Sequence, residues 1–401
     1  MQSTQPALER LIGKVANDRA LVSALQDAHV RLGKVGSQDA IECGKQLAGI
    51  ETSLMRATED AFQKVSTPRR GATVDTGFTA ADELRLGEYL ATVFSVRRVT
   101  VDSLEVISGG FSKQTLKACL SDSAGTVPKA LILRLDLPAA TAFSSTVVAS
   151  EYPILVAASR HGATVPQPYA LEATGTVLGR PFMVLGLVAG RTVGNLFSYP
   201  PPDAVLGADI AREMARIHTI PTSALGIEAS SSMAERIRAE IELSRRNWDA
   251  LGRHSAIVEE GFSALERNLH LAEGMRCLVH GDTALHNIMV SEGRVSSILD
   301  WEFAKIGNPA DDLGYVQDTA THLMGWNAFL DAYRDAGGTV PPAKQIEFYR
   351  LLSLVRICTL VSQADTAFRT GVLTDIQYAV PGSYFLRGVL CKLGDLVQRM
   401  P

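Results

Sequence analysis

The stretch LVHGDTALHNIMVSEGRVSSILDWEFAKIGNPADDL, from Leu278 to Leu313, holds short apolar runs whose ends carry polar residues. Its NIMV and VSSILD segments predict two short strands, and the SEGR segment between them, with glycine at its third position, predicts a hairpin turn. Such a hairpin would bring Asp282, Asn287 and Asp300 near one another, because the first two flank a short loop and the third follows the returning strand.

Two carboxylates and an amide in this arrangement indicate phosphoryl transfer. One carboxylate can orient a hydroxyl nucleophile and accept its proton, while the amide oxygen and the second carboxylate can hold Mg²⁺ against nucleotide phosphates. Both metal ligands would then be hard oxygen atoms, which Mg²⁺ prefers.

The same residues closely resemble the catalytic and metal segments of the aminoglycoside phosphotransferase-like kinases, which show H-G-D-x-x-x-x-N and then a strand that ends in Asp. Here the pattern stands as His280, Gly281, Asp282, Asn287 and Asp300. The segment DWEFAKIGNPADDL resembles the branch with phosphotransferase domains associated with acyl-CoA dehydrogenases. The resemblance covers roughly residues 85–395.

The resemblance implies an α+β, bilobal protein-kinase-like fold with a helical N-terminal extension. We expect the extension and a linker over residues 1–80, a small β-rich nucleotide-binding N-lobe over 81–190, and a larger helical C-lobe over 191–401 that holds the catalytic loop and the acceptor site. The implied cofactors are ATP and Mg²⁺.

Roles for the matching residues follow from the resemblance. Asp282 would be the catalytic base, Asn287 and Asp300 the magnesium ligands, and His280 a brace for the catalytic loop. Glu302 would either touch a second metal ion or be a surface carboxylate, and both readings stay open.

The preceding β-rich region would bind the nucleotide. The segment ISGGFSKQT matches the family's glycine loop, in which Gly109 and Gly110 let the backbone approach the phosphates and Ser112 adds a hydroxyl. Alternation along the next strand points to Arg134 as the cation for the α- and β-phosphates, in place of the usual Lys. Glu151 occupies the family position that pairs with this cation.

The segment VLGLVAG aligns with the family's hinge, so the adenine would be recognised by the backbone, through the Gly186 carbonyl and the Val188 N–H. The family's hinge Glu is absent, since Gly186 stands in its place. Backbone recognition should survive that change.

The N-terminal region lies outside the resemblance. Apolar residues recur at helical spacing in residues 5–66 and predict two amphipathic helices, and residues 66–77 predict a linker. We expect the helices to pack against the rest of the chain or to form a homodimer, and the alternative is a lid over the substrate site. Thr79 is the expected N-cap of a further helix.

Composition narrows the class of protein. The chain of 401 residues has a formal net charge of −4, 46% hydrophobic and 20% charged residues, and no basic run, which argues against nucleic acid or membrane as the partner. Five scattered cysteines suggest neither a disulfide framework nor a zinc site. No continuous apolar run reaches the roughly 18 residues of a membrane span, and the N-terminus lacks a signal-peptide pattern, so we expect a cytoplasmic protein.

The sequence defines the chemical class of the phosphate acceptor less closely than the catalytic residues. The C-terminal region is balanced in charge and rich in apolar and aromatic residues, which favours an amphipathic hydroxyl acceptor, such as a hydroxyacyl-CoA or another catabolic alcohol. Arg356 and Arg369 are candidates for contact with an anionic acceptor. The alternatives are an antibiotic phosphotransferase for aminoglycosides or macrolides, and a catalytically silent ATP-binding scaffold. Asp312 is expected to cap a helix rather than to react.

Overall fold

The computed structural model describes residues 77–107, 113–137, 146–194, 199–226, 231–372 and 385–400. The elements below belong to one compact unit of the chain, Val74–Thr366 with Tyr378–Pro401, apart from the last residues of one helix. The helices expected within residues 5–66 lie outside the described residues, as does the glycine loop.

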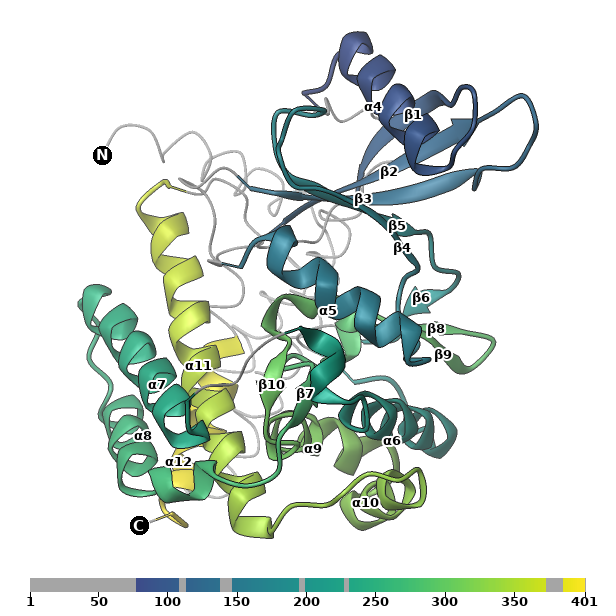
Figure 1. The fold of residues 1–401 in the computed structure, drawn as a ribbon. Coiled ribbons are helices and arrows are strands. Elements are labelled where there is room, and N and C mark those ends of the chain that lie inside the picture. Colours follow the sequence, from purple (N-terminus) through teal and green to yellow (C-terminus); the bar gives the residue numbers. More distant parts are fainter. Residues whose placement is uncertain are drawn as a thin grey trace, which may run out of the picture. The chain divides into compact units, whose positions relative to one another are not determined.

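A five-stranded antiparallel sheet forms the smaller lobe (Figure 1). Its strands follow the order β1-β2-β3-β5-β4. Their bounds are β1 Thr100–Ile107, β2 Lys113–Ser121, β3 Ala130–Asp136, β4 Pro168–Glu172 and β5 Phe182–Gly186.

Helix α4, Ala80–Val93, begins at the position that the sequence predicts. The Thr79 side chain accepts a hydrogen bond from the Asp82 backbone N–H, and the Thr79 backbone N–H donates to the Asp82 carboxylate. This reciprocal capping box satisfies two donors at the start of the helix and confirms Thr79 as the N-cap.

Alternation along β3 assigns its two faces. Leu131, Leu133 and Leu135 are fully buried against α4 and the neighbouring strands. Arg134 therefore points to the opposite face, the side on which α5, Val148–Arg160, packs against β3, β4 and β5.

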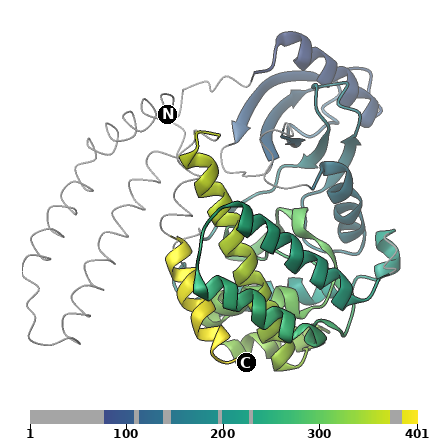
Figure 2. The same ribbon diagram turned by 90° about the vertical axis from the view of Figure 1, so that its left-hand side faces the viewer.

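Helices dominate the larger lobe. Figures 1 and 2 show α7, α8, α11 and α12 side by side, and α6, α9 and α10 as a second group. Their bounds are α6 Ala204–His218, α7 Met233–Ala250, α8 Ala256–Arg267, α9 Ala310–Met324, α10 Trp326–Asp335, α11 Ala343–Arg369 and α12 Leu386–Val397. The α+β expectation is confirmed.

Four short strands lie in and beside the polar segment Leu278–Leu313. Strands β8 (Ile288–Ser291) and β9 (Arg294–Ile298) form the predicted hairpin, and Glu292 and Gly293 at its turn have φ values of 52° and 75°. Strand β7 (Cys277–Val279) pairs with β10 (Lys305–Gly307). The β7–β10 pair brings residues near the two ends of the segment together, and the β8–β9 hairpin lies between them in the sequence.

Helix α11 is, among the described residues, the one helix long and apolar enough to cross a membrane by length and composition alone. Over its most apolar window, 56% of the residues are buried inside the structure. Its Phe348, Tyr349 and Val355 side chains belong to the largest hydrophobic core, which accounts for the apolar composition.

Candidate active site

The loop from His280 to Asn287, here called the HGD loop, follows β7 directly. The His280 side chain is buried, and its Nε2–H donates to the Leu299 carbonyl at 2.9 Å. Its Nδ1 accepts from the Asp282 backbone N–H at 3.2 Å, and its ring meets Trp301 edge to face. Because both ring nitrogens are engaged, the imidazole links the HGD loop to the end of β9.

The Asp312 carboxylate holds the same loop from α9. It accepts hydrogen bonds from the backbone N–H groups of His280 at 2.8 Å and Gly281 at 2.7 Å, and from His218 Nε2 at 2.9 Å. Burial alone would raise the pKa of Asp312, but these hydrogen bonds and the neighbouring histidines lower it below its ordinary value. Asp312 therefore stays ionised and anchors the loop backbone.

The expected capping role of Asp312 is wrong. Helix α9 begins at Ala310, so Asp312 lies inside the first turn and turns its side chain toward the HGD loop. The capping position is Pro309, and Asn308 Oδ1 accepts from the Ala310 backbone N–H instead. The sequence could not separate the two roles, because an acidic residue in a first turn is favourable in either case.

Asp282 and Asn287 touch directly. Asn287 Nδ2 donates to Asp282 Oδ2 at 2.8 Å and to the Asp282 carbonyl at 3.1 Å. This orientation leaves Asn287 Oδ1 for another partner, such as a cation. Tyr315 of α9 lies beside the same carboxylate, and burial together with the Asp282 charge raises the pKa of Tyr315 well above its ordinary value.

Asp300 follows β9 in a left-handed conformation, with φ 64° and ψ 71°. Its Oδ1 forms an ion pair with Arg134 at 2.7 Å, which links the helical lobe to β3. Burial would raise the pKa of Asp300, but the charge and hydrogen bond of Arg134 lower it below its ordinary value. A strained backbone at a residue held by charge is typical of a functional site.

Arg134 has a second acidic neighbour. Glu151 Oε1 lies 4.0 Å from Arg134 Nη1, and the Glu151 side chain is 2% exposed. Burial raises the pKa of Glu151, although Arg134 opposes the shift. Arg134 Nε is buried and has no hydrogen-bond acceptor within the described ranges, so a phosphate oxygen would supply one.

The remaining nucleotide-site candidates are only partly described. Gly186 ends β5, and its N–H donates to the Gln167 carbonyl at 2.8 Å, so this N–H is not free for a ligand. Val188 follows where the chain leaves the sheet. Gly109, Gly110 and Ser112 lie outside the described residues.

The donors fit Mg²⁺ held with a nucleotide. Asn287 Oδ1 and the Asp300 carboxylate would offer oxygen donors, and Mg²⁺ is usually bound by one or two protein groups together with phosphates and waters. In the part of the chain that the structure describes, no group of three or more His, Cys, Asp or Glu side chains could hold a metal ion.

Arg356 of α11, a candidate for contact with an anionic acceptor, is held by protein partners in this structure. Its Nη2 donates to the Gly281 carbonyl at 2.8 Å and its Nη1 to Glu240 at 3.3 Å, and it lies over the Phe303 ring. The guanidinium is thus engaged by the HGD loop and a carboxylate. Sequence reasoning missed this contact because 75 residues separate Arg356 from Gly281.

Comparison with known proteins bears out this picture. The family described as "Phosphotransferase enzyme family" matches residues 103–349. Acyl-CoA dehydrogenase family member 11 of Rattus norvegicus is 27% identical over 195 residues, which cover 47% of this chain but only 25% of that protein. This match confirms the resemblance to the acyl-CoA dehydrogenase-associated branch.

Solved structures share the fold. A Ralstonia eutropha JMP134 structure assigned to the aminoglycoside phosphotransferases has a TM-score of 0.62 and 19% identity, and covers 79% of this chain and 98% of that one. A thermostable mutant of aminoglycoside phosphotransferase APH(4)-Ia, in a ternary complex with ADP and hygromycin B, has a TM-score of 0.51 and 16% identity over 78% and 98% of the two chains. These likenesses confirm the expected bilobal kinase-like fold. With a family match that spans more than half of its length, the chain belongs to the phosphotransferase enzyme family.

Proposed function

We propose that the protein transfers the γ-phosphoryl group of Mg·ATP to a hydroxyl group of a small organic molecule. One observation carries the proposal: Asp282 and Asn287 touch in the HGD loop, while Asp300 meets Arg134 between the two lobes. The family supports the reaction class, and the ADP bound by APH(4)-Ia supports a nucleotide as the donor.

Asp282 is the proposed catalytic base. Asn287 Nδ2 and the Tyr315 side chain both hydrogen-bond the Asp282 carboxylate, which fixes its orientation, and this carboxylate is proposed to orient an acceptor hydroxyl and take its proton. His280 and Asp312 hold the loop backbone on either side, so the carboxylate is positioned before the acceptor arrives.

Asn287 and Asp300 are the proposed ligands of Mg²⁺. When bound, the metal neutralises charge on the phosphates and on the group in transfer. Arg134 would turn from Asp300 to the α- and β-phosphates, with Glu151 beside it as a counter-charge. The backbone of Gly186 and Val188 is proposed to meet the adenine.

The proposed acceptor is an amphipathic alcohol, such as a hydroxyacyl thioester. The relatives named acyl-CoA dehydrogenases support this class. Charge near the HGD loop agrees with it, because Glu240 and Asp311 are already paired with Lys305. An aminoglycoside is a polycation and needs several unpaired carboxylates, whereas these two, among the described residues beside the HGD loop, are already matched by a cation.

Two other functions make different predictions. An antibiotic phosphotransferase, which the structural neighbours represent, would turn over hygromycin-like or macrolide acceptors. A silent nucleotide-binding scaffold would bind Mg·ATP without any acceptor-dependent turnover.

The test is ADP release from Mg·ATP across an acceptor panel of hydroxyacyl-CoAs, free hydroxy acids, secondary and tertiary alcohols, aminoglycosides and macrolides. The matched control is Asp282→Asn, which keeps the size of the side chain and removes the base. We expect release with a hydroxyl acceptor, a phosphorylated product by mass spectrometry, and no release from the variant. Turnover that survives in Asp282→Asn would overturn the assignment of the base.

A further inference from the structure

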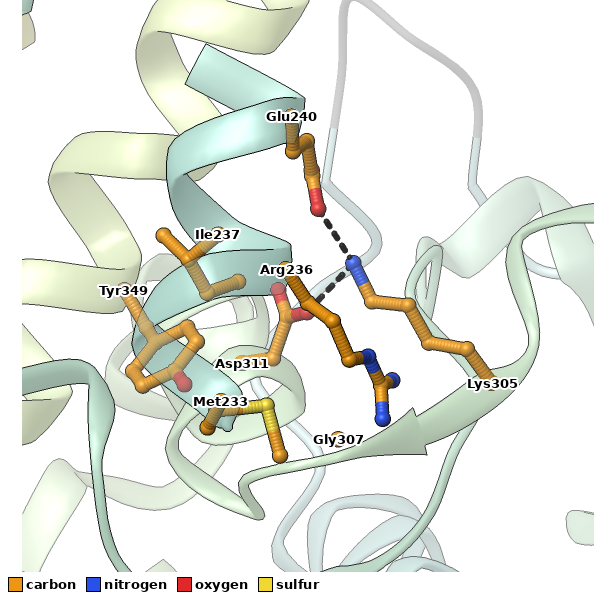
Figure 3. Close-up of a pocket in the computed structure, with 8 residues that line it drawn as sticks. All are labelled: Met233, Arg236, Ile237, Glu240, Lys305, Gly307, Asp311 and Tyr349. Carbon is orange, nitrogen blue, oxygen red and sulfur yellow. Dashed lines mark hydrogen bonds and ion pairs between the residues drawn. The ribbon is translucent and has the colours of Figure 1, made fainter. Parts of the chain in front are cut away.

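A partly buried group of charges lies behind the HGD loop. It consists of Glu240 on α7, Lys305 on β10, Asp311 on α9 and Arg356 on α11, and is called the ionic cluster below. Figure 3 shows Lys305 between Glu240 and Asp311, with Nζ 2.7 Å and 3.3 Å from their carboxylates. Arg356 completes the cluster, 3.3 Å from Glu240 and 3.9 Å from Asp311. Four elements distant in sequence thus meet through charge.

The ionic cluster is poorly explained as a device for stability. A cavity of about 180 Å³ borders Glu240, Lys305 and Asp311, and neither Asp311 oxygen accepts a hydrogen bond within the described residues. Burial, the largest influence, raises the pKa of Asp311. Desolvated ion pairs often contribute little to net stability compared with apolar packing, so a cluster of this kind needs another reason.

One contact of the cluster reaches the proposed catalytic residue. Arg356 Nη2 donates to the Gly281 carbonyl, which belongs to the peptide bond directly before Asp282. The N–H of that same peptide bond donates to His280 Nδ1. The peptide plane is therefore held from both sides, and this plane sets the direction in which the Asp282 side chain leaves the backbone.

Gly281 cannot fix the orientation of the Gly281–Asp282 peptide plane by itself. Its φ is +80°, and a Cβ at this position would lie 2.7 Å from the Phe303 carbonyl oxygen. Glycine is therefore required, but glycine is also the most flexible residue, so the peptide needs an external anchor. Arg356, which is 12% exposed and rests on the Phe303 ring, supplies a rigid forked donor at this place.

We propose that Arg356 is a positioning residue: it fixes the Gly281–Asp282 peptide, and the ionic cluster fixes Arg356. The inference rests on the proposed role of Asp282 as the base. In this role Arg356 acts through the Gly281–Asp282 peptide and not through the nucleotide, so its loss should lower kcat and leave KM for ATP unchanged.

Three variants of the full chain separate positioning from stability. Arg356→Met removes the guanidinium and leaves Lys305 facing two carboxylates. Glu240→Gln combined with Arg356→Met restores the balance of one cation to one carboxylate, but the Gly281 carbonyl still lacks its donor. Arg350→Met is the matched control, because Arg350 lies on the same helix and pairs with Asp318 at 2.7 Å.

The first readout is hydrogen exchange of the backbone amides in the HGD loop, which needs no acceptor. We expect exchange about tenfold faster in Arg356→Met than in Arg350→Met, as for the loss of one charge-assisted hydrogen bond. The second is turnover with the acceptor found in the panel, where kcat should fall roughly 100-fold with KM for ATP unchanged. Arg356→Lys should recover part of kcat, since a lysine can reach one of the two partners.

The double variant decides the question. We expect its midpoint of chemical unfolding to return toward that of the wild type while loop exchange stays fast and kcat stays low. If kcat and exchange recover with stability, Arg356 acts only through the charge balance, and the proposal is wrong. Arg356→Met behaving like Arg350→Met would overturn it equally, whereas turnover in Asp282→Asn would overturn the role of the base and leave the exchange result standing.

Discussion

Asp312→Asn is expected to destabilise the fold by about 3–5 kcal/mol, because a buried carboxylate becomes an amide of the same size. The carboxylate accepts from His280, Gly281 and His218, and its side chain is 1% exposed. An amide has one acceptor oxygen, so its NH₂ group must face at least one of these donors. One orphaned buried N–H costs about 1–3 kcal/mol, and each remaining bond loses roughly half its strength without the charge.

The measurement is urea unfolding followed by intrinsic fluorescence, with Asp318→Asn as the control. Asp318 lies on the same helix, is 33% exposed, and pairs with Arg350 and Lys392. An exposed pair of this kind contributes about 0–1 kcal/mol. A loss below about 1 kcal/mol in Asp312→Asn would refute the reasoning, because three charge-assisted bonds could not then be net stabilising.

The stability difference between the wild type and Asp312→Asn should depend on pH. The pKa of Asp312 is lowered in the folded protein, so the folded state binds fewer protons than the unfolded state between the two pKa values. The stability from the ionised carboxylate is fully present above about pH 4, the ordinary range for Asp, and is lost as the pH falls through the lower folded pKa. The gap between wild type and Asp312→Asn should therefore shrink under acid conditions, and a gap that widened there would contradict the sign.

Four further variants test separate contacts. Asp300→Ala should weaken ATP binding in calorimetry only when Mg²⁺ is present, so an equal loss in EDTA would remove its role as a ligand. Arg134→Lys keeps the charge but not the fork, so KM for ATP should rise roughly tenfold with kcat little changed, and an unchanged KM would exclude phosphate contact. Gly281→Ala should destabilise by at least about 2 kcal/mol in urea, because φ is +80° and the new Cβ meets the Phe303 carbonyl at 2.7 Å. Glu292→Gly should raise Tm by about 1–2 °C in a thermal scan, since its φ of 52° suits glycine, and a lower Tm would mean that the glutamate has a contact of its own.

Local sequence patterns predicted the features that depend on neighbours in the chain. The Thr79 cap, the β8–β9 hairpin and the position of Arg134 on the face of β3 opposite the leucines each follow from a few adjacent residues. The HGD motif likewise identified the residues that the structure brings together. Each of these signals is complete within one element or one turn.

The contacts that were missed join distant elements. Asp312 reaches Gly281 across 31 residues, and Arg356 reaches the same glycine across 75. Helical periodicity gives the buried face of α9 and α11, but it does not say which loop lies against that face. A buried Arg and a buried Asp on core helices are still informative, since such charges are rarely buried without partners.

The Arg134–Asp300 pair explains how one site can serve both charges of Mg·ATP. The two side chains are 13% and 26% exposed and lie 2.7 Å apart, so each supplies the counter-charge of the other. In the proposed function the metal takes Asp300 and the phosphates take Arg134, and both charges stay compensated throughout the exchange. Metal alone would leave Arg134 with Glu151, 4.0 Å away, in place of its close partner, and nucleotide alone would leave Asp300 without its cation, each at a cost for a partly buried charge. Metal and nucleotide should therefore bind cooperatively, because only the two together supply new counter-charges to both Arg134 and Asp300.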